Sequence, residues 1–271
     1  MTGGSVADTA VPATTDQVIT VGDVPVVVRR GGEGPPLLVF HDELGFPGWM
    51  SWNDRLAVSY ELIMPMQPAY GQTPKVEWIR SYRDLGGFYA RMVREQGWHG
   101  APVIGFSAGA YTAAEMAAAC PDIFSRMVLV GPLGLRPTDG EIFDFLAVTI
   151  RTHVAATVSN VDAPEFAIIY GGEMTPAQFE LFEDARAETA RIGWEPFMFD
   201  PSLGHLLEGV GDLPTLLVRG SDDLIAPAGC VSAYEAVLPN STTVSIAGAG
   251  HRPEIEDADA FLSAVTTFLG G

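Results

Sequence analysis

A serine, an acidic pair and a histidine occur in the sequence where they could act together in nucleophilic catalysis. Ser107 lies at the centre of the segment Gly105-Phe106-Ser107-Ala108-Gly109, and Asp222, Asp223 and His251 follow apolar runs later in the chain. A serine hydroxyl is a weak nucleophile at neutral pH, so it needs a base within hydrogen-bond reach and an acid that orients the base. The residue types therefore predict Ser107 as nucleophile, His251 as base and one of the two aspartates as the orienting acid.

The surroundings of Ser107, more than its motif, favour a catalytic role. The pattern Gly-x-Ser-x-Gly alone arises by chance in many chains because glycine is common. Here it follows the apolar pair Val103-Ile104 and precedes an alanine-rich stretch from Ala108 to Cys120, which gives strand, turn and helix in the order that the motif requires. We expect Ser107 at a strained elbow, near the positive end of the helix dipole.

His251 is the histidine best placed to be the base. It follows the apolar run 243–246 through the Ala-Gly-Ala-Gly segment 247–250, a flexible loop that can carry an imidazole over the edge of a sheet. The other four histidines stand in less suggestive places: His41 ends an apolar run, His99 lies in a polar turn, and His153 and His205 lie in a long insertion.

The acidic pair is placed at the end of a strand. The apolar run 215–218 leads into Arg219-Gly220-Ser221-Asp222-Asp223, which sets both carboxylates at the carboxyl edge where open α/β sheets bind their ligands. The preceding run, which ends at Val130, is followed by no carboxylate. The resulting chain order of serine, aspartate and histidine is typical of one class of catalytic triad.

Apolar runs alternate with amphipathic segments along most of the chain. This alternation predicts an α/β fold with a mostly parallel eight-stranded sheet that has helices on both faces. Helices are expected over residues 78–93 and in the last segment, where Phe261, Val265 and Phe268 share one face. The expected strands are residues 18–21 and 24–28, which form an antiparallel hairpin, and residues 37–40, 62–64, 103–106, 127–130, 215–218 and 243–246.

The interval between the sixth and seventh strands is too long for a single crossover. We expect residues 136–212 to form an inserted helical cap, residues 17–135 and 213–271 to form the core, and residues 1–16 to form a flexible arm. The clearest helix of the cap opens at Thr175-Pro176 with capping-box spacing. The cap is rich in aromatic side chains, some of which could line an apolar pocket above the sheet.

Composition narrows the classes of partner. A net charge of -19 repels nucleic acid and anionic membranes, so a small-molecule substrate is the expected partner. No basic leader or long apolar run precedes the first strand, which favours a cytoplasmic location. Only Cys120 and Cys230 are present, far apart in the chain, and they suggest neither a disulfide framework nor a metal site. The oligomeric state stays open, a homo-oligomer included.

The chain resembles the α/β-hydrolase superfamily, in the branch with a helical cap that includes epoxide-hydrolase-like esterases and hydrolases of meta-cleavage products. The resemblance is carried by four segments: 38–45 (LVFHDELG), the elbow 105–109 (GFSAG), 216–223 (LLVRGSDD) and 248–256 (GAGHRPEIE). In the family pattern G-x-x-D the acid falls at Asp223, which leaves Asp222 as a turn residue. The resemblance implies no cofactor, and Ser107 separates the chain from relatives that place aspartate at the elbow.

The resemblance also implies an oxyanion hole made by the backbone amides of Glu43 and Ala108. The family has a His-Gly pair before the first of these amides, whereas this sequence has His41-Asp42. Aspartate tolerates left-handed backbone angles better than most residues, so Asp42 could replace the glycine. We expect the carboxylates of Asp42 and Glu43 to point away from an oxyanion.

Three functions fit these residues. The first is an esterase that acts on a small apolar or aromatic substrate through an acyl-enzyme. The second is a carbon-carbon hydrolase of a vinylogous diketone. Enzymes of that kind commonly have Trp after the catalytic histidine and an arginine in the cap, whereas here Arg252 follows His251 and the cap holds Arg151, Arg186 and Arg191. The third is a ligand-binding protein or cofactor-free oxygenase of the same fold.

Overall fold

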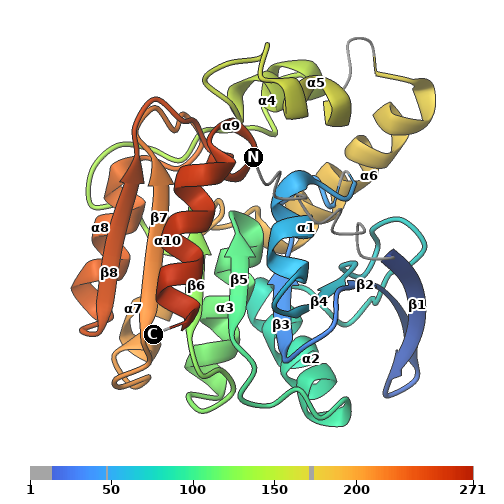
Figure 1. The fold of residues 1–271 in the computed structure, drawn as a ribbon, viewed down its shortest axis with the longest axis vertical. Coiled ribbons are helices and arrows are strands. Elements are labelled where there is room, and N and C mark those ends of the chain that lie inside the picture. Colours follow the sequence, from blue (N-terminus) through green and yellow to red (C-terminus); the bar gives the residue numbers. More distant parts are fainter. Residues whose placement is uncertain (1–13, 47, 171–173, 271) are drawn as a thin grey trace, which may run out of the picture.

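A computed structural model describes residues 14–46, 48–170 and 174–270 (Figure 1). The strands are β1 (Thr14–Val21), β2 (Val24–Gly31), β3 (Pro36–Phe40), β4 (Glu61–Pro65), β5 (Val103–Phe106), β6 (Met127–Val130), β7 (Thr215–Gly220) and β8 (Ser241–Ile246). The helices are α1 (Ser51–Ala57), α2 (Tyr82–Glu95), α3 (Ala108–Ala119), α4 (Ile150–Ala156), α5 (Pro164–Tyr170), α6 (Pro176–Gly193), α7 (Leu203–Leu207), α8 (Ala228–Val237), α9 (Pro253–Glu256) and α10 (Ala258–Gly270).

The eight strands form one sheet in the order β1-β2-β4-β3-β5-β6-β7-β8. The pairs β1–β2 and β2–β4 are antiparallel and the remaining pairs are parallel, which confirms the fold class expected from the alternation of runs. The chain leaves β3 toward β4 on one side and returns to β5 on the other, so the loops after β3 and β5 depart in opposite directions. Such a switch point opens a crevice at the carboxyl edge of the sheet.

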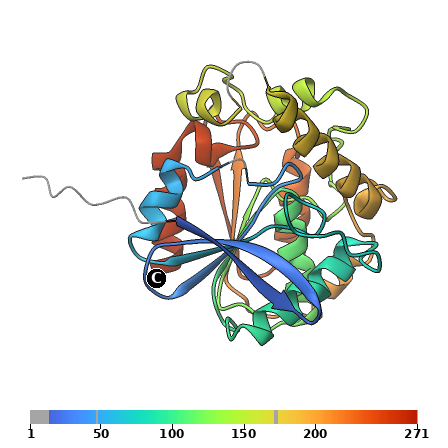
Figure 2. The same cartoon turned by 90° about the vertical axis from the view of Figure 1, so that its right-hand side faces the viewer.

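Helices cover both faces of the sheet (Figures 1 and 2). Helices α1 and α10 contact each other on one face, where Trp52, Phe106 and Phe261 form a buried aromatic group with ring centroids 5.3 to 6.1 Å apart. On the other face α3 contacts α2 and α7, and α7 contacts α8. Each face therefore has its own apolar core, and the sheet between them is a rigid support for the loops at its edge.

The segment between β6 and β7 carries α4, α5, α6 and α7. Helices α4 and α5 lie beyond the carboxyl ends of the parallel strands, at the top of Figure 1, and α6 runs down beside them. The clearest helix expected in this segment is present, because Thr175 caps α6 and exchanges hydrogen bonds with Gln178. Whether residues 136–212 act as a separate cap remains a prediction.

Two expected boundaries were wrong. Strand β1 begins at Thr14, so the expected arm overlaps it at residues 14–16, while residues 1–13 lie outside the described part of the chain. Pairing with Arg29 explains this, since the Asp16 carboxylate lies 2.8 Å from the Arg29 guanidinium. Helix α2 begins at Tyr82 and not at Trp78, because the Ser81 hydroxyl accepts a hydrogen bond from the Asp84 amide and sets the first turn.

None of the helices in the described ranges combines the length and apolar character that a transmembrane span requires.

Candidate active site

Ser107 lies at a sharp turn between β5 and α3. Its φ of 50° and ψ of -111° fall in a region that residues with side chains rarely adopt. A Cβ on Gly109 would stand 2.3 Å from the Phe40 carbonyl oxygen, and one on Gly105 would stand 2.6 Å from the Gly109 carbonyl oxygen. Both glycines are therefore required, because the elbow is pressed against the end of β3.

His251 and Asp223 are brought together by the loops after β8 and β7. The His251 Nδ1 donates a hydrogen bond of 2.8 Å to Asp223 Oδ2, and both side chains are buried. The other oxygen of Asp223 accepts from the amides of Ile225 and Ala226 at 2.8 and 2.9 Å. The carboxylate is thus held from both sides, and it fixes the imidazole with Nε2 available to a third group.

Gly131 lies between the turn at Ser107 and the imidazole of His251. The Ser107 amide donates to the Val130 carbonyl at 2.8 Å, and a Cβ on the next residue, Gly131, would lie 2.6 Å from His251 Cε1. Among the described residues, neither Ser107 Oγ nor His251 Nε2 has a hydrogen-bond partner, although both are buried. Two complementary polar atoms are thus left for a reacting molecule.

The two amides expected to form an oxyanion hole are on neighbouring segments. The first turn of α3, which contains Ala108, packs on the main chain of Phe40 and His41. Within the described ranges, neither the Glu43 nor the Ala108 amide donates to a protein acceptor. The φ of Asp42 is not positive, so this residue does not adopt the left-handed conformation that the sequence would have allowed it in place of glycine.

The Asp42 side chain is occupied by other groups. Its Oδ1 accepts a hydrogen bond of 2.9 Å from the Leu44 amide, and its Oδ2 lies 3.0 Å from an Nη1 of Arg252. The same guanidinium hydrogen-bonds the Tyr170 hydroxyl and lies 3.1 Å from a carboxylate oxygen of Glu254. Arg252 therefore joins the loop after β3 to helix α5, and the charge of Asp42 is paired.

The expectation that the Glu43 carboxylate points away from the site was wrong. Glu43 is fully buried, its Oε1 lies 3.0 Å from Nε2 of His153, and its Oε2 has no partner among the described residues. Burial raises the pKa of Glu43, but the hydrogen bond and charge of His153 outweigh it, and His251 and the Ser107 hydroxyl add smaller effects, so the pKa falls to about 2. An ionised carboxylate therefore lies beside Ser107.

The pKa of His251 is raised by its acidic surroundings. Burial lowers the pKa, but the charge and hydrogen bond of Asp223 outweigh it, with further contributions from the charges of Glu43 and Asp42, and bring the pKa to about 9. The imidazole consequently needs alkaline conditions to lose its proton and accept one from a nucleophile.

Sequence reasoning missed the role of His153, which it left in the insertion without a function. His153 lies on α4 with its ring stacked on Phe145, at 4.6 Å between centroids. Its partner Glu43 is 110 positions away in the chain. No local pattern predicts such a pair. The one signal in the sequence is that His153 stands among apolar residues of the helix, which could have indicated a buried histidine that needs a partner.

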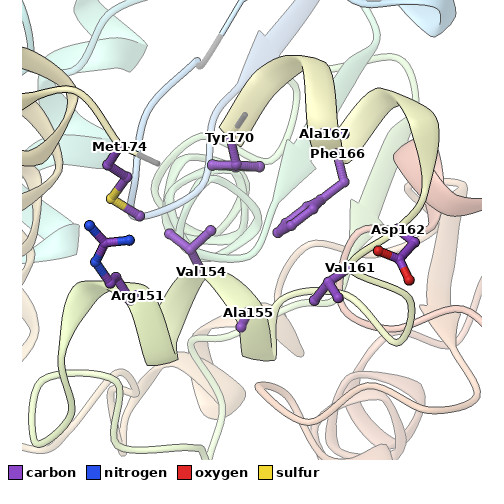
Figure 3. A pocket seen from close by; sticks show the side chains of 9 residues that line it. All are labelled: Arg151, Val154, Ala155, Val161, Asp162, Phe166, Ala167, Tyr170 and Met174. Atoms are coloured by element: carbon purple, nitrogen blue, oxygen red, sulfur yellow. The ribbon is translucent and has the colours of Figure 1, made fainter. Parts of the chain in front are cut away.

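A cavity of about 350 Å³ lies between α4 and α5 (Figure 3). Val154 from α4 faces Phe166 and Tyr170 from α5, and Met174 and Arg151 lie at one end. Tyr170 also contacts Arg252, the residue after His251, whereas Ser107 and His251 themselves do not line the cavity. No cluster of three or more His, Cys, Asp or Glu side chains in the described ranges could hold a metal ion.

A model of the alpha/beta hydrolase family matches residues 20–264, which include every element of the site. The chain belongs to the alpha/beta hydrolase family. The match spans β2 to β8 and the segment of α4 to α7, so the elbow, the His251 loop and the Asp223 turn lie within one family domain.

Several proteins described as hydrolases resemble this alpha/beta hydrolase. A 2-hydroxy-6-oxononadienedioate/2-hydroxy-6-oxononatrienedioate hydrolase of Pseudomonas putida is 24% identical over 264 residues, which cover 90% of this chain and 87% of that protein. The structure of 2-hydroxy-6-oxo-6-phenylhexa-2,4-dienoate hydrolase from a Rhodococcus species superimposes with a TM-score of 0.78 at 16% identity, and covers 96% of this chain and all of that one.

Another relative has a different description. The acetyltransferase component of the acetoin cleaving system of Cupriavidus necator is 26% identical over 252 residues, covering 90% of this alpha/beta hydrolase chain. The chain spans 66% of the length of that protein.

Substitution of Gly131 by alanine tests the packing of the elbow on the histidine. The new Cβ would overlap the imidazole at Cε1 and Nδ1, so we expect displacement of His251 and a loss of about 100-fold in the rate at which a fluorophosphonate labels Ser107. The downfield NMR resonance of the proton shared with Asp223 should also disappear. Gly87→Ala, where a Cβ meets no atom within 4 Å, is the matched control. An unchanged resonance and labelling rate in Gly131→Ala would contradict this geometry.

Proposed function

We propose that this protein is a serine hydrolase that cleaves a carboxylic ester of a small apolar or aromatic substrate. The observation that carries the proposal is the 2.8 Å hydrogen bond from His251 to Asp223, which leaves Nε2 of the same imidazole buried and unpartnered, with the ring packed on Gly131, the residue after the Val130 carbonyl that accepts from the Ser107 amide. Family membership supports it, because the residues lie within the matched domain.

The reaction follows from the arrangement of these groups. Ser107 Oγ attacks the carbonyl carbon while His251 Nε2 takes its proton, and Asp223 holds the imidazole and stabilises its charge. The amides of Glu43 and Ala108 donate to the negative oxygen of the tetrahedral intermediate. His251 then protonates the leaving alcohol, and a water molecule, deprotonated by the same base, releases the acid from the acyl-enzyme. No cofactor enters these steps.

The cavity between α4 and α5 is the proposed site of the apolar part of the substrate. Its wall contains Val154, Phe166, Tyr170 and Met174, four of the side chains that could bury an alkyl or aryl group. Burial of each methylene contributes roughly 0.8 kcal/mol, so a chain of several carbons gains substantial binding free energy there.

Carbon-carbon hydrolysis is the second candidate, and the relative from Pseudomonas putida favours it. Such substrates carry carboxylates, which need cationic partners. Arg186 donates to the carbonyls of Phe145 and Val148, and Arg191 pairs with Glu188, so neither presents an unoccupied guanidinium to the site. Arg151 at the cavity is the remaining cap arginine named from the sequence. Faster turnover of ring-fission products than of aryl esters would favour this candidate.

Fluorophosphonate labelling tests the proposed nucleophile directly. We expect the wild-type protein to be labelled and to hydrolyse 4-nitrophenyl butyrate, and Ser107→Ala to lose both activities because the attacking oxygen is gone. Ser263→Ala, which removes an exposed hydroxyl from α10, should keep both. Labelling that persists in Ser107→Ala would refute the assignment.

The pH dependence of ester hydrolysis follows from the raised pKa of His251. Protonated His251 cannot accept the serine proton, so kcat/KM should rise from pH 6 toward pH 9 and level off near the pKa of about 9. In Asp223→Asn the charge that raises this pKa is lost, so the midpoint should move to lower pH while the plateau falls roughly 10³- to 10⁴-fold. A profile that is flat between pH 6 and 10 would contradict the role of His251 as base.

A series of 4-nitrophenyl esters from acetate to octanoate tests the apolar cavity. We expect kcat/KM to increase with chain length in the wild type, and Val154→Phe, which fills the cavity, to lower the octanoate value roughly tenfold relative to acetate. Phe179→Ala changes an exposed side chain of α6 and is the control. A wild-type preference for acetate would argue against an apolar acyl pocket.

A further inference from the structure

Glu43 combines three features that a purely structural carboxylate would not need. It lies in the loop that follows β3, directly after Asp42, and its side chain has 0% exposure. Only one of its carboxylate oxygens is hydrogen-bonded, and the partner is His153. The other oxygen, Oε2, is buried with no partner among the described residues, as are Ser107 Oγ and His251 Nε2. A buried carboxylate oxygen without a donor is costly, so a molecule that donates to it would relieve that cost on binding.

The charges around Ser107 are unequally compensated. Asp42 is paired with Arg252, and Asp223 is hydrogen-bonded to His251. Once His251 is neutral and ready to act as a base, the negative charges of Asp223 and Glu43 both remain near the nucleophile. Glu43 is the one whose second oxygen makes no hydrogen bond in the described part of the chain, although the Ser107 hydroxyl lies near enough to lower the pKa of this carboxyl.

This arrangement is unfavourable for a plain ester. The tetrahedral intermediate places a negative oxygen next to the amides of Glu43 and Ala108, and a nearby carboxylate repels that charge in a buried site of low polarity. A positive group on the substrate would offset the repulsion, whereas a second carboxylate would add to it.

We propose that the free oxygen of Glu43, held in place by His153, binds an ammonium or similarly cationic group of the substrate close to the scissile carbonyl and excludes substrates with a carboxylate there. Glu43 is then a specificity-determining residue, and the preferred substrates are cationic esters with an apolar portion. The inference rests on the proposed hydrolase function of Ser107.

Pairs of esters that match in shape and differ in charge provide the test. The acyl side is probed with the 4-nitrophenyl esters of β-alanine and butyric acid, and the alcohol side with acetylcholine and 3,3-dimethylbutyl acetate. We expect the wild type to favour the cationic member of at least one pair by tenfold or more in kcat/KM. It should also turn over 4-nitrophenyl hemisuccinate more slowly than the butyrate. Glu43→Gln keeps an acceptor for His153 but removes the charge, so the preference should fall to near unity and the hemisuccinate should gain.

Two measurements separate the outcomes. Glu115→Gln, which neutralises a buried carboxylate on α3 bound to Arg83, should keep the wild-type preference. Fluorophosphonate labelling of Glu43→Gln reports whether its nucleophile is intact. Equal rates within both pairs for the wild type overturn the inference even if the variant fails to fold, and so does a preference that survives in a labelled Glu43→Gln. Loss of Ser107-dependent labelling in the wild type would instead defeat the hydrolase function.

Discussion

The close contact between the turn at Ser107 and the end of β3 is the constraint on which the candidate site depends. The first turn of α3 approaches the Phe40 carbonyl so closely that a Cβ at Gly109 would stand 2.3 Å from it, and the backbone at Ser107 accepts a strained φ of 50° as a result. This contact is available because β3 and β5 are neighbours whose loops diverge. It sets the amides of Ala108 and Glu43 on adjacent segments, and it also brings the Glu43 carboxylate to the serine.

Charged side chains link the helices above the sheet to the loops that carry the candidate site. Arg252 reaches both Asp42 and Tyr170, His153 of α4 binds Glu43, and Glu256 accepts hydrogen bonds from the amides of Ser159 and Gly250. Ion pairs in such positions add little net stability, because removing the charges from water costs about as much as their attraction returns. Their geometric effect is more important, since each contact ties the position of α4 or α5 to a residue next to Ser107 or His251.

The sequence predicts those parts of the site that follow from local patterns. A strand, a glycine-bounded serine and a helix identify the elbow, and the ends of two further strands locate Asp223 and His251, which the structure brings within 2.8 Å. The orientation of Glu43 could not be predicted, because its partner His153 is supplied by α4 and is 110 positions away. For the same reason the pairing of Asp42 with Arg252 was missed. The start of α2 was misjudged because the apolar period extends to residues before Ser81, the N-cap at which the helix begins.

The same geometry restricts the kind of molecule that can react. In the proposed reaction the substrate brings its carbonyl to a serine flanked by carboxylates, and the paired charge of Arg252 leaves little positive potential to attract an anion. The cavity beside Tyr170 can contribute binding free energy from burial of apolar surface, but it cannot by itself discriminate between molecules of similar shape. Discrimination therefore has to come from the polar groups that remain unpaired. Among the described residues next to Ser107, the Glu43 carboxylate is a charged group of this kind, fully buried with one oxygen that makes no hydrogen bond, and the proposed selection by charge rests on that oxygen.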